Sequence, residues 1–119
     1  MNKKEYKNIL SQSSWWVINK AVTKSIGIDA SLILSDLMSK HEYFLNRGMI
    51  DEQGFFFNTR DNIENDTTIP IYRQNKAIEI LKQYGLVEIT NKGIPPKTRF
   101  KLNFKNIDKL IDSLHFTDE

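Results

Sequence analysis

Four side chains between positions 72 and 76 carry the hydrogen-bonding groups that read nucleic-acid bases. They are Tyr72, Arg73, Asn75 and Lys76. A guanidinium such as that of Arg73 can donate two parallel hydrogen bonds to guanine, and an amide such as that of Asn75 can pair with adenine. Lys76 supplies a point charge, and Tyr72 can reach a phosphate or a thymine methyl group. Because all four fall within five positions, we interpret them as a candidate base-contacting surface.

A second group of polar and cationic side chains is suited to contact the sugar-phosphate backbone. Asn91-Lys92-Gly93 has the composition of a tight turn, and Pro95-Pro96 stiffens the chain that follows. A stiff cationic hairpin can lie along phosphates or enter the minor groove. The predicted contacts to the DNA backbone are Thr59, Arg60, Thr68, Lys92, Lys97 and Arg99.

Charge is distributed unevenly along the chain, although the whole protein carries a formal charge of only +2. Residues 71–101 hold seven cationic and two acidic side chains, a net charge of +5, which raises the local affinity for phosphate. Asp61, Glu64 and Asp66 argue in the other direction, because carboxylates beside DNA repel phosphates unless they point away or pair with Arg60 or Arg73. If they face outward, they indicate a protein-binding surface instead.

Helices and strands with recognisable signals must position these side chains. From Asp29 to Phe44, apolar residues recur at helical spacing, and the Asp29 carboxylate can cap that helix. Residues 49–54 resemble a strand that leads into an exposed turn, and Phe55–Asn58 either pairs back or joins the wing sheet. Thr59 can cap the next helix. In the helix that follows Pro70, the residues predicted to face inward are Ile71, Gln74, Ala77, Ile78, Leu81 and Tyr84.

The order of these elements is that of a winged helix-turn-helix, an α+β and mainly helical fold that places one helix in the DNA major groove. We expect one domain over residues 1–119, with residues 1–13 loosely ordered and additional helices at both ends. The predicted segments are a first core helix at 29–44, the helix-turn-helix at 59–84, the wing at 86–102 and a C-terminal helix at 104–115.

Several other classes of protein are disfavoured by composition. The chain has no cysteine, which excludes disulfides and thiolate metal sites. We find neither a secretory signal nor an apolar run long enough to cross a membrane, so we expect a cytoplasmic protein without membrane contact. His41 and His115 belong to no metal-ligand or nucleophile motif, and we interpret them as solvent-facing. We therefore predict that the protein is not an enzyme and has no metal or cofactor.

The segment from Val17 to Leu102 also resembles a known family. The matching pieces are Ile18-Asn19-Lys20-Ala21, Ile26-Gly27-Ile28-Asp29-Ala30, Leu32-Ile33-Leu34, Asp51-Glu52-Gln53-Gly54-Phe55-Phe56, Pro70 through Ala77-Ile78, Leu81 with Gly85-Leu86-Val87, and Gly93-Ile94-Pro95 before Arg99-Phe100. This pattern resembles the N-terminal winged-helix domain of plasmid and phage replication initiators and replisome organisers. Family members often continue into a second domain for loading or oligomerisation.

The resemblance implies sequence-specific binding of double-stranded DNA, in replication initiation or transcription control, by a protein of a prokaryotic mobile element. It also implies frequent dimerisation, and the candidate surfaces are Phe104–Leu114 and Trp15–Ile18, which can equally pack within one subunit. The alternative is a winged-helix protein-interaction module that docks on a host or replication protein.

Overall fold

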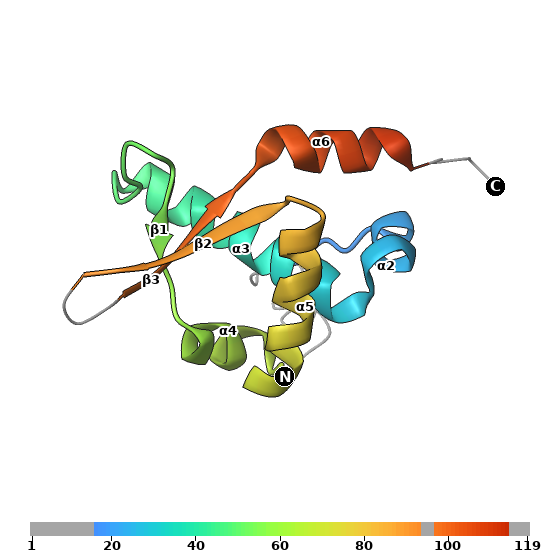
Figure 1. Cartoon of the computed structure of the whole chain (residues 1–119), viewed down its shortest axis with the longest axis horizontal. Coiled ribbons are helices and arrows are strands. Elements are labelled where there is room, and N and C mark those ends of the chain that lie inside the picture. Colours follow the sequence, from blue (N-terminus) through green and yellow to red (C-terminus); the bar gives the residue numbers. More distant parts are fainter. Residues whose placement is uncertain (1–15, 94–96, 115–119) are drawn as a thin grey trace, which may run out of the picture.

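The computed structural model describes residues 16–93 and 97–114, which form five helices and one three-stranded antiparallel sheet (Figure 1). The helices are α2 (Lys20–Ile26), α3 (Ile28–Asn46), α4 (Arg60–Thr67), α5 (Ile71–Gln83) and α6 (Phe104–Ser113). The strands are β1 (Phe56–Phe57), β2 (Val87–Lys92) and β3 (Lys97–Leu102). This is the predicted α+β, mainly helical winged helix with additional helices.

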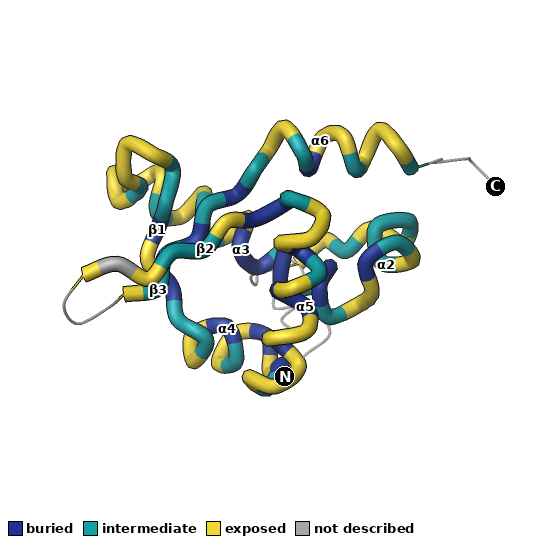
Figure 2. The backbone as a smooth tube through the Cα atoms, in the orientation of Figure 1, coloured by how far each residue is buried: buried dark blue, intermediate teal, exposed yellow. Residues whose placement is uncertain are grey.

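The core is built around α3, whose apolar residues follow the helical spacing of the sequence. Ile33 and Leu37 are fully buried and belong to one cluster with Leu81 of α5 and with Phe56 and Phe100 of the sheet. Dark blue segments of α3, α5 and the sheet accordingly meet at the middle of the molecule (Figure 2). Burial of apolar surface here fixes α5 against α3 and leaves the opposite side of α5 in solvent.

Hydrogen bonds from two side chains, Thr59 and Gln74, hold the helix-turn-helix together. The Thr59 hydroxyl accepts a hydrogen bond from the Asn62 backbone N–H at 3.0 Å, so Thr59 caps α4 as predicted. Gln74 of α5 is completely buried, and its Nε2 donates to the carbonyl oxygens of Arg60 at 3.0 Å and Ile69 at 2.8 Å. One side chain therefore ties α5 to the start of α4 and to the turn between the helices.

Thr68 ends α4 in a left-handed conformation, with φ at +65°. A β-branched residue is strained there, and the conformation costs about 1–2 kcal/mol relative to its usual regions. We expect Thr68→Gly to raise the free energy of unfolding by about 0.5–1 kcal/mol, because relief of this strain exceeds the extra backbone entropy of glycine. Urea denaturation measures the difference, and a loss of stability would contradict it.

The wing is a hairpin with β3 at the centre of the sheet, in the order β1-β3-β2. Val87 pairs with Leu102 at its base and Lys92 pairs with Lys97 at its end. Phe56 and Phe57 pair with Phe100 and Arg99, so the segment before α4 joins the wing sheet. The hairpin projects from the body of the molecule at the left of Figure 1.

Three sequence-based expectations about local structure were wrong. Helix α3 begins at Ile28 with Gly27 at its N-cap, so Asp29 is not the capping residue. Residues 49–54 form a turn rather than a strand, because the Asp51 carboxylate accepts hydrogen bonds from the backbone N–H groups of Gln53 and Phe55. Ile71 and Tyr84 do not face inward: they are 41% and 47% exposed at the two ends of α5.

The remaining helices extend close to their predicted limits. α3 is longer than the expected 29–44 by one residue at its start and two at its end. α6 ends at Ser113, and residue 115 lies outside the described part of the chain, as do residues 1–13, Trp15 and Pro95-Pro96.

Candidate nucleic-acid interface

The four predicted base contacts lie on the solvent-facing side of α5, within its first two turns. All are exposed, and Tyr72 is the most exposed of the large hydrophobic side chains on this helix at 75%. Gln74 and Ala77 between and after them are buried, which fixes which side of the helix faces out. No side chain caps the start of α5, so amide groups of its first turn remain available to an anion.

Arg73 is held by a carboxylate from the neighbouring helix. Its Nε donates to Asp29 Oδ2 at 2.9 Å and its Nη2 donates to Asp29 Oδ1 at 2.5 Å. Two parallel, charge-assisted hydrogen bonds of this kind fix the plane of a guanidinium as well as its position. Asp29 is therefore a site residue that sequence reasoning assigned a different role, as a helix cap.

The ion pair has a measurable signature. The hydrogen bonds and charge of Arg73 lower the pKa of the Asp29 carboxyl below its ordinary value. Since the pKa is lowered in the folded state, the stabilisation from this pair is complete above the ordinary aspartate range and is lost as the pH falls through the lowered value. We expect an NMR titration to find this lowered pKa, and to find it raised in Arg73→Ala. An unchanged pKa in that variant would show that the pair does not form in solution.

Asn75 contacts Arg60, so one predicted base contact meets one predicted backbone contact. Arg60 Nη1 donates to Asn75 Oδ1 at 3.0 Å. Partial burial lowers the pKa of the Arg60 guanidinium, which still remains cationic at neutral pH. The contact joins the exposed side of α5 to the start of α4.

The start of α4 is in turn joined to the wing. Between them lies Asn58, which is buried and whose backbone N–H donates to the Thr98 carbonyl at 3.1 Å. Just before it, Phe57 is 44% exposed, and Lys97 Nζ lies 5.9 Å from the centroid of its ring. These contacts connect Asn75 through Arg60, Thr59 and the Phe57–Asn58 segment to Lys97, and we call this series of residues a strip.

The cations of the wing share one side of β3. Phe100 and Leu102 are buried, and Lys97, Arg99 and Lys101 alternate with the inward-facing residues. Lys101 lies 3.8 Å from Glu88, which partly neutralises it. Lys92 pairs in register with Lys97, and its side chain lies outside the described part of the structure, as do residues 94–96.

The three carboxylates near the helix-turn-helix differ in their surroundings. Asp66 forms an ion pair with Lys40 of α3 at 2.8 Å, a partner that the sequence did not predict. Asp61 is exposed in the first turn of α4, and Glu64 is half-buried. Neither forms an ion pair among the described side chains. Lys40 also pairs with the buried Asp36 at 2.7 Å, so this one cation is shared by two carboxylates and the charge of Asp66 is only partly neutralised.

Other residues singled out in the sequence lie away from this strip. Thr68 is exposed at the opposite end of α4 from Arg60. His41 is not fully solvent-facing as predicted: its ring packs edge-on against Phe104 at 4.9 Å and against Phe56 at 6.0 Å. His115 lies outside the described residues. Among residues 16–93 and 97–114, no group of three or more acidic or histidine side chains is arranged to hold a metal ion.

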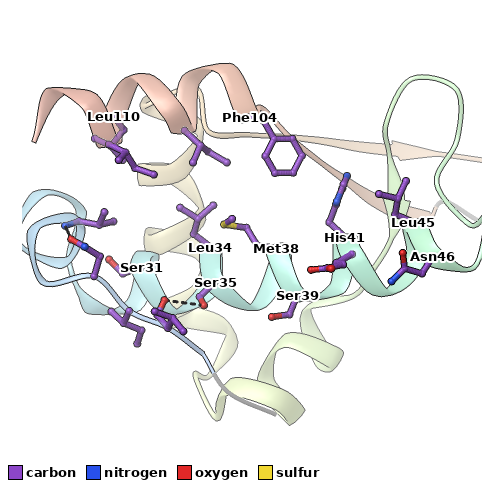
Figure 3. A pocket seen from close by; sticks show the side chains of 17 residues that line it. Ser31, Leu34, Ser35, Met38, Ser39, His41, Leu45, Asn46, Phe104 and Leu110 are labelled. Carbon is purple, nitrogen blue, oxygen red and sulfur yellow. Dashed lines mark hydrogen bonds between the residues drawn. The ribbon is translucent and has the colours of Figure 1, made fainter.

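The two candidate dimer segments line one groove. It has a volume of about 570 Å³ and is lined by Val17 and Ile18 and by Phe104 and Ile111 of α6. Figure 3 shows Phe104 and Leu110 of α6 across this groove from Leu34 and Met38 of α3. Trp16 donates from Nε1 to the buried Asp36 at 3.2 Å, so this ring is tied to α3. No helix in the described part of the chain has the length and hydropathy of a membrane span.

Two solved structures share this fold. One is an "N-Terminal domain of DNA binding protein", with a TM-score of 0.64 and 14% identity over 94% of this chain and 92% of that one. The other is a "Structure of Rep-DNA complex", with a TM-score of 0.63 and 14% identity over 98% of each chain. No family model and no curated protein matches the sequence. At this level of identity the two similarities establish the fold.

Proposed function

We propose that this chain binds double-stranded DNA in a sequence-dependent manner, with α5 in the major groove and the wing on the backbone. The observation that carries this proposal is the strip of polar and cationic groups that runs from the exposed side of α5 through Arg60 to Lys97. A single helix fits the width of the major groove, and its early residues are the ones that meet base edges.

The electrostatics support the same assignment. Arg60 and Lys97 lie along the strip, and Lys76 is exposed on α5 next to Asn75 in the sequence. Asp66, which would repel phosphate, is partly neutralised by Lys40, a cation that it shares with Asp36. Helix N-termini attract anions, and the first turn of α5 has no capping side chain, although the Asp29 carboxylate on Arg73 offsets part of this attraction. Phosphates beside these groups would gain charge-assisted hydrogen bonds.

The biological role that we propose is replication initiation or transcription control in a phage or plasmid. It is supported by the resemblance of residues 17–102 to replication initiators and by the structural similarity to a Rep–DNA complex. Recovery of an origin or an operator among the bound duplexes would distinguish the two roles.

Fluorescence anisotropy with random and selected duplexes tests the proposal. At 50 mM salt we expect binding to both, with affinity that falls as a power of the salt concentration because counterions are released. At higher salt the selected duplexes should remain bound while the random ones dissociate. Absence of binding to any duplex at 50 mM salt would exclude the proposal.

The alternative protein-interaction module predicts a different result. Asp61 is exposed and Glu64 is half-buried on α4, where a partner with a basic surface could contact them. A protein partner that remains bound after nuclease treatment, and that Glu64→Lys releases, would support the module. Persistence of that partner together with absence of duplex binding would replace our proposal with the alternative.

The homodimer stays a prediction. Val17, Phe104 and Ile111, which line the groove between α3 and α6, are exposed and apolar in the single chain. Sedimentation equilibrium of the protein with and without duplex decides the oligomeric state.

A further inference from the structure

Asp29 and Arg73 connect the first turn of α3 with the first turn of α5, although they are 44 positions apart in the sequence. Nothing in the packing of the core requires a charged pair here, because both side chains lie at the surface with 26% and 48% of their area exposed. Arg73 is exposed and follows Tyr72 in the first turn of α5, and Asp29 reaches it from α3. The geometry of the pair therefore determines which N–H groups of Arg73 can bind another molecule.

The carboxylate occupies one edge of the guanidinium and leaves another edge unused. Asp29 accepts from Nε and from one hydrogen of Nη2. A guanidinium has five N–H donors in a fixed plane, so three remain: both hydrogens of Nη1 and the second hydrogen of Nη2. Nη1 donates to no side chain or carbonyl in the described residues. The unused Nη1–Nη2 edge presents two parallel donors.

We propose that Asp29 is a positioning residue that orients Arg73 to read guanine in the major groove. The inference rests on the proposed DNA binding and specifies which base that binding selects. Guanine presents O6 and N7 as two adjacent acceptors, which match two parallel N–H donors, whereas adenine presents a donor beside N7 and cytosine presents a donor. A guanidinium held in one plane thus favours guanine over the other bases.

The carboxylate also prevents Arg73 from acting as a general phosphate ligand. A free arginine side chain samples many rotamers and would bind the nearest phosphate. Because Asp29 binds Nε and Nη2, the side chain has already lost that freedom in the unbound protein. The negative charge of Asp29 also disfavours a phosphate nearby. Asp29 therefore lowers the affinity for DNA of any sequence and raises the selectivity for guanine at one base pair.

Selection of bound duplexes from a random pool tests this inference, with the wild type, Asp29→Asn, Arg73→Lys and Arg73→Ala. Asp61→Asn is the matched control, because it removes an exposed carboxylate from α4 without touching Arg73. Thermal unfolding followed by circular dichroism shows that each variant is folded. Anisotropy titrations then compare one selected duplex with the same duplex in which the guanine at the affected position is replaced by adenine.

We expect the wild type to prefer guanine over adenine at that position by about 10-fold or more. Asp29→Asn, Arg73→Lys and Arg73→Ala should each reduce this preference to about twofold or less, at the same position and at no other. Asp61→Asn should retain it. Asp29→Asn should still bind random duplexes at least as tightly as the wild type, because a negative charge has been removed.

Two results would overturn the inference. If Asp29→Asn binds all duplexes more tightly and keeps the guanine preference, Asp29 only competes with phosphate for Arg73. If the wild type shows no guanine preference that depends on Arg73, the free edge of the guanidinium reads no base. Failure of the wild type to bind any duplex is distinguishable from both results and would exclude the proposed function itself.

Discussion

When Lys97 and Arg99 are both replaced by alanine, we expect duplex affinity at 50 mM salt to fall by about 10- to 100-fold for selected and random sequences alike. Lys97 is exposed and Arg99 half-buried on the same side of β3, and we predict that both contact phosphates. Each lost phosphate contact also reduces the dependence of log K on log salt by about 0.9. The slope should therefore become less negative by about 2.

The matched control is the replacement of Lys105 and Lys109 by alanine. These two exposed lysines lie on α6, which Figure 1 places on the other side of the sheet from α4, and the variant has the same net charge as the wing variant. It should keep both the affinity and the salt slope within about twofold, because distant charges are screened at this ionic strength. An equal effect of both double variants would show that net charge, rather than a wing contact, sets the affinity.

Replacement of Gln74 by alanine should lower the free energy of unfolding by about 2–3 kcal/mol. The buried amide donates to the carbonyls of Arg60 and Ile69, and its loss leaves both oxygens without this partner and opens a cavity between α4 and α5. Because the same bonds set the position of α5 relative to α4, binding to selected duplexes should weaken more than binding to random ones. Urea denaturation and anisotropy measure the two effects.

Gln83→Ala is the control for this prediction. Gln83 is the last residue of the same helix and is exposed, so its replacement should change stability by less than about 0.5 kcal/mol. A similarly small effect for Gln74→Ala would mean that packing of Ala77 and Leu81 alone fixes the two helices.

Much of the fold could be predicted from spacing. Ile33, Leu34 and Leu37 recur at helical intervals and are all buried, and Ala77, Ile78 and Leu81 behave in the same way on α5. Local predictions such as the Thr59 cap are also confirmed, because they depend only on residues that are close in the sequence.

The wrong predictions of local structure concern residues whose contacts, near or far along the chain, are not determined by the local sequence pattern. Asp29 was expected to cap its own helix, but it pairs instead with an arginine that no local pattern connects to it. Asp51 binds backbone N–H groups close to it in the sequence, and the turn that results replaces the strand predicted from Met49 and Ile50. Ile71 and Tyr84 fit the apolar period of α5 but lie at its two ends, where both remain exposed.

The candidate site was likewise predictable where it depends on spacing along one helix, and not where it depends on contacts between helices. The types and spacing of Tyr72, Arg73 and Lys76 sufficed to place them on the outer side of one helix. Pairings such as Arg60 with Asn75 and Lys40 with Asp66 depend on how the helices cross, and sequence patterns do not encode those distances. The base contacts themselves stay a prediction until the selection experiment is performed.

The uneven width of the sheet has a mechanical consequence. β1 pairs with β3 opposite Phe100 and Arg99, and Asn58 adds one backbone bond to Thr98, so only the outer end of the hairpin at Lys92 and Lys97 is a two-stranded ribbon. Two-stranded ribbons twist more strongly and open more readily than wider sheets, so amide protons near Lys92 and Lys97 should exchange with solvent faster than those near Val87 and Leu102. If the protein binds DNA as we propose, the two-stranded part of the ribbon near Lys92 and Lys97 can adapt to the local groove width, while α5 stays packed against α3. Tolerance to DNA shape and discrimination between bases would then reside in different parts of the same small protein.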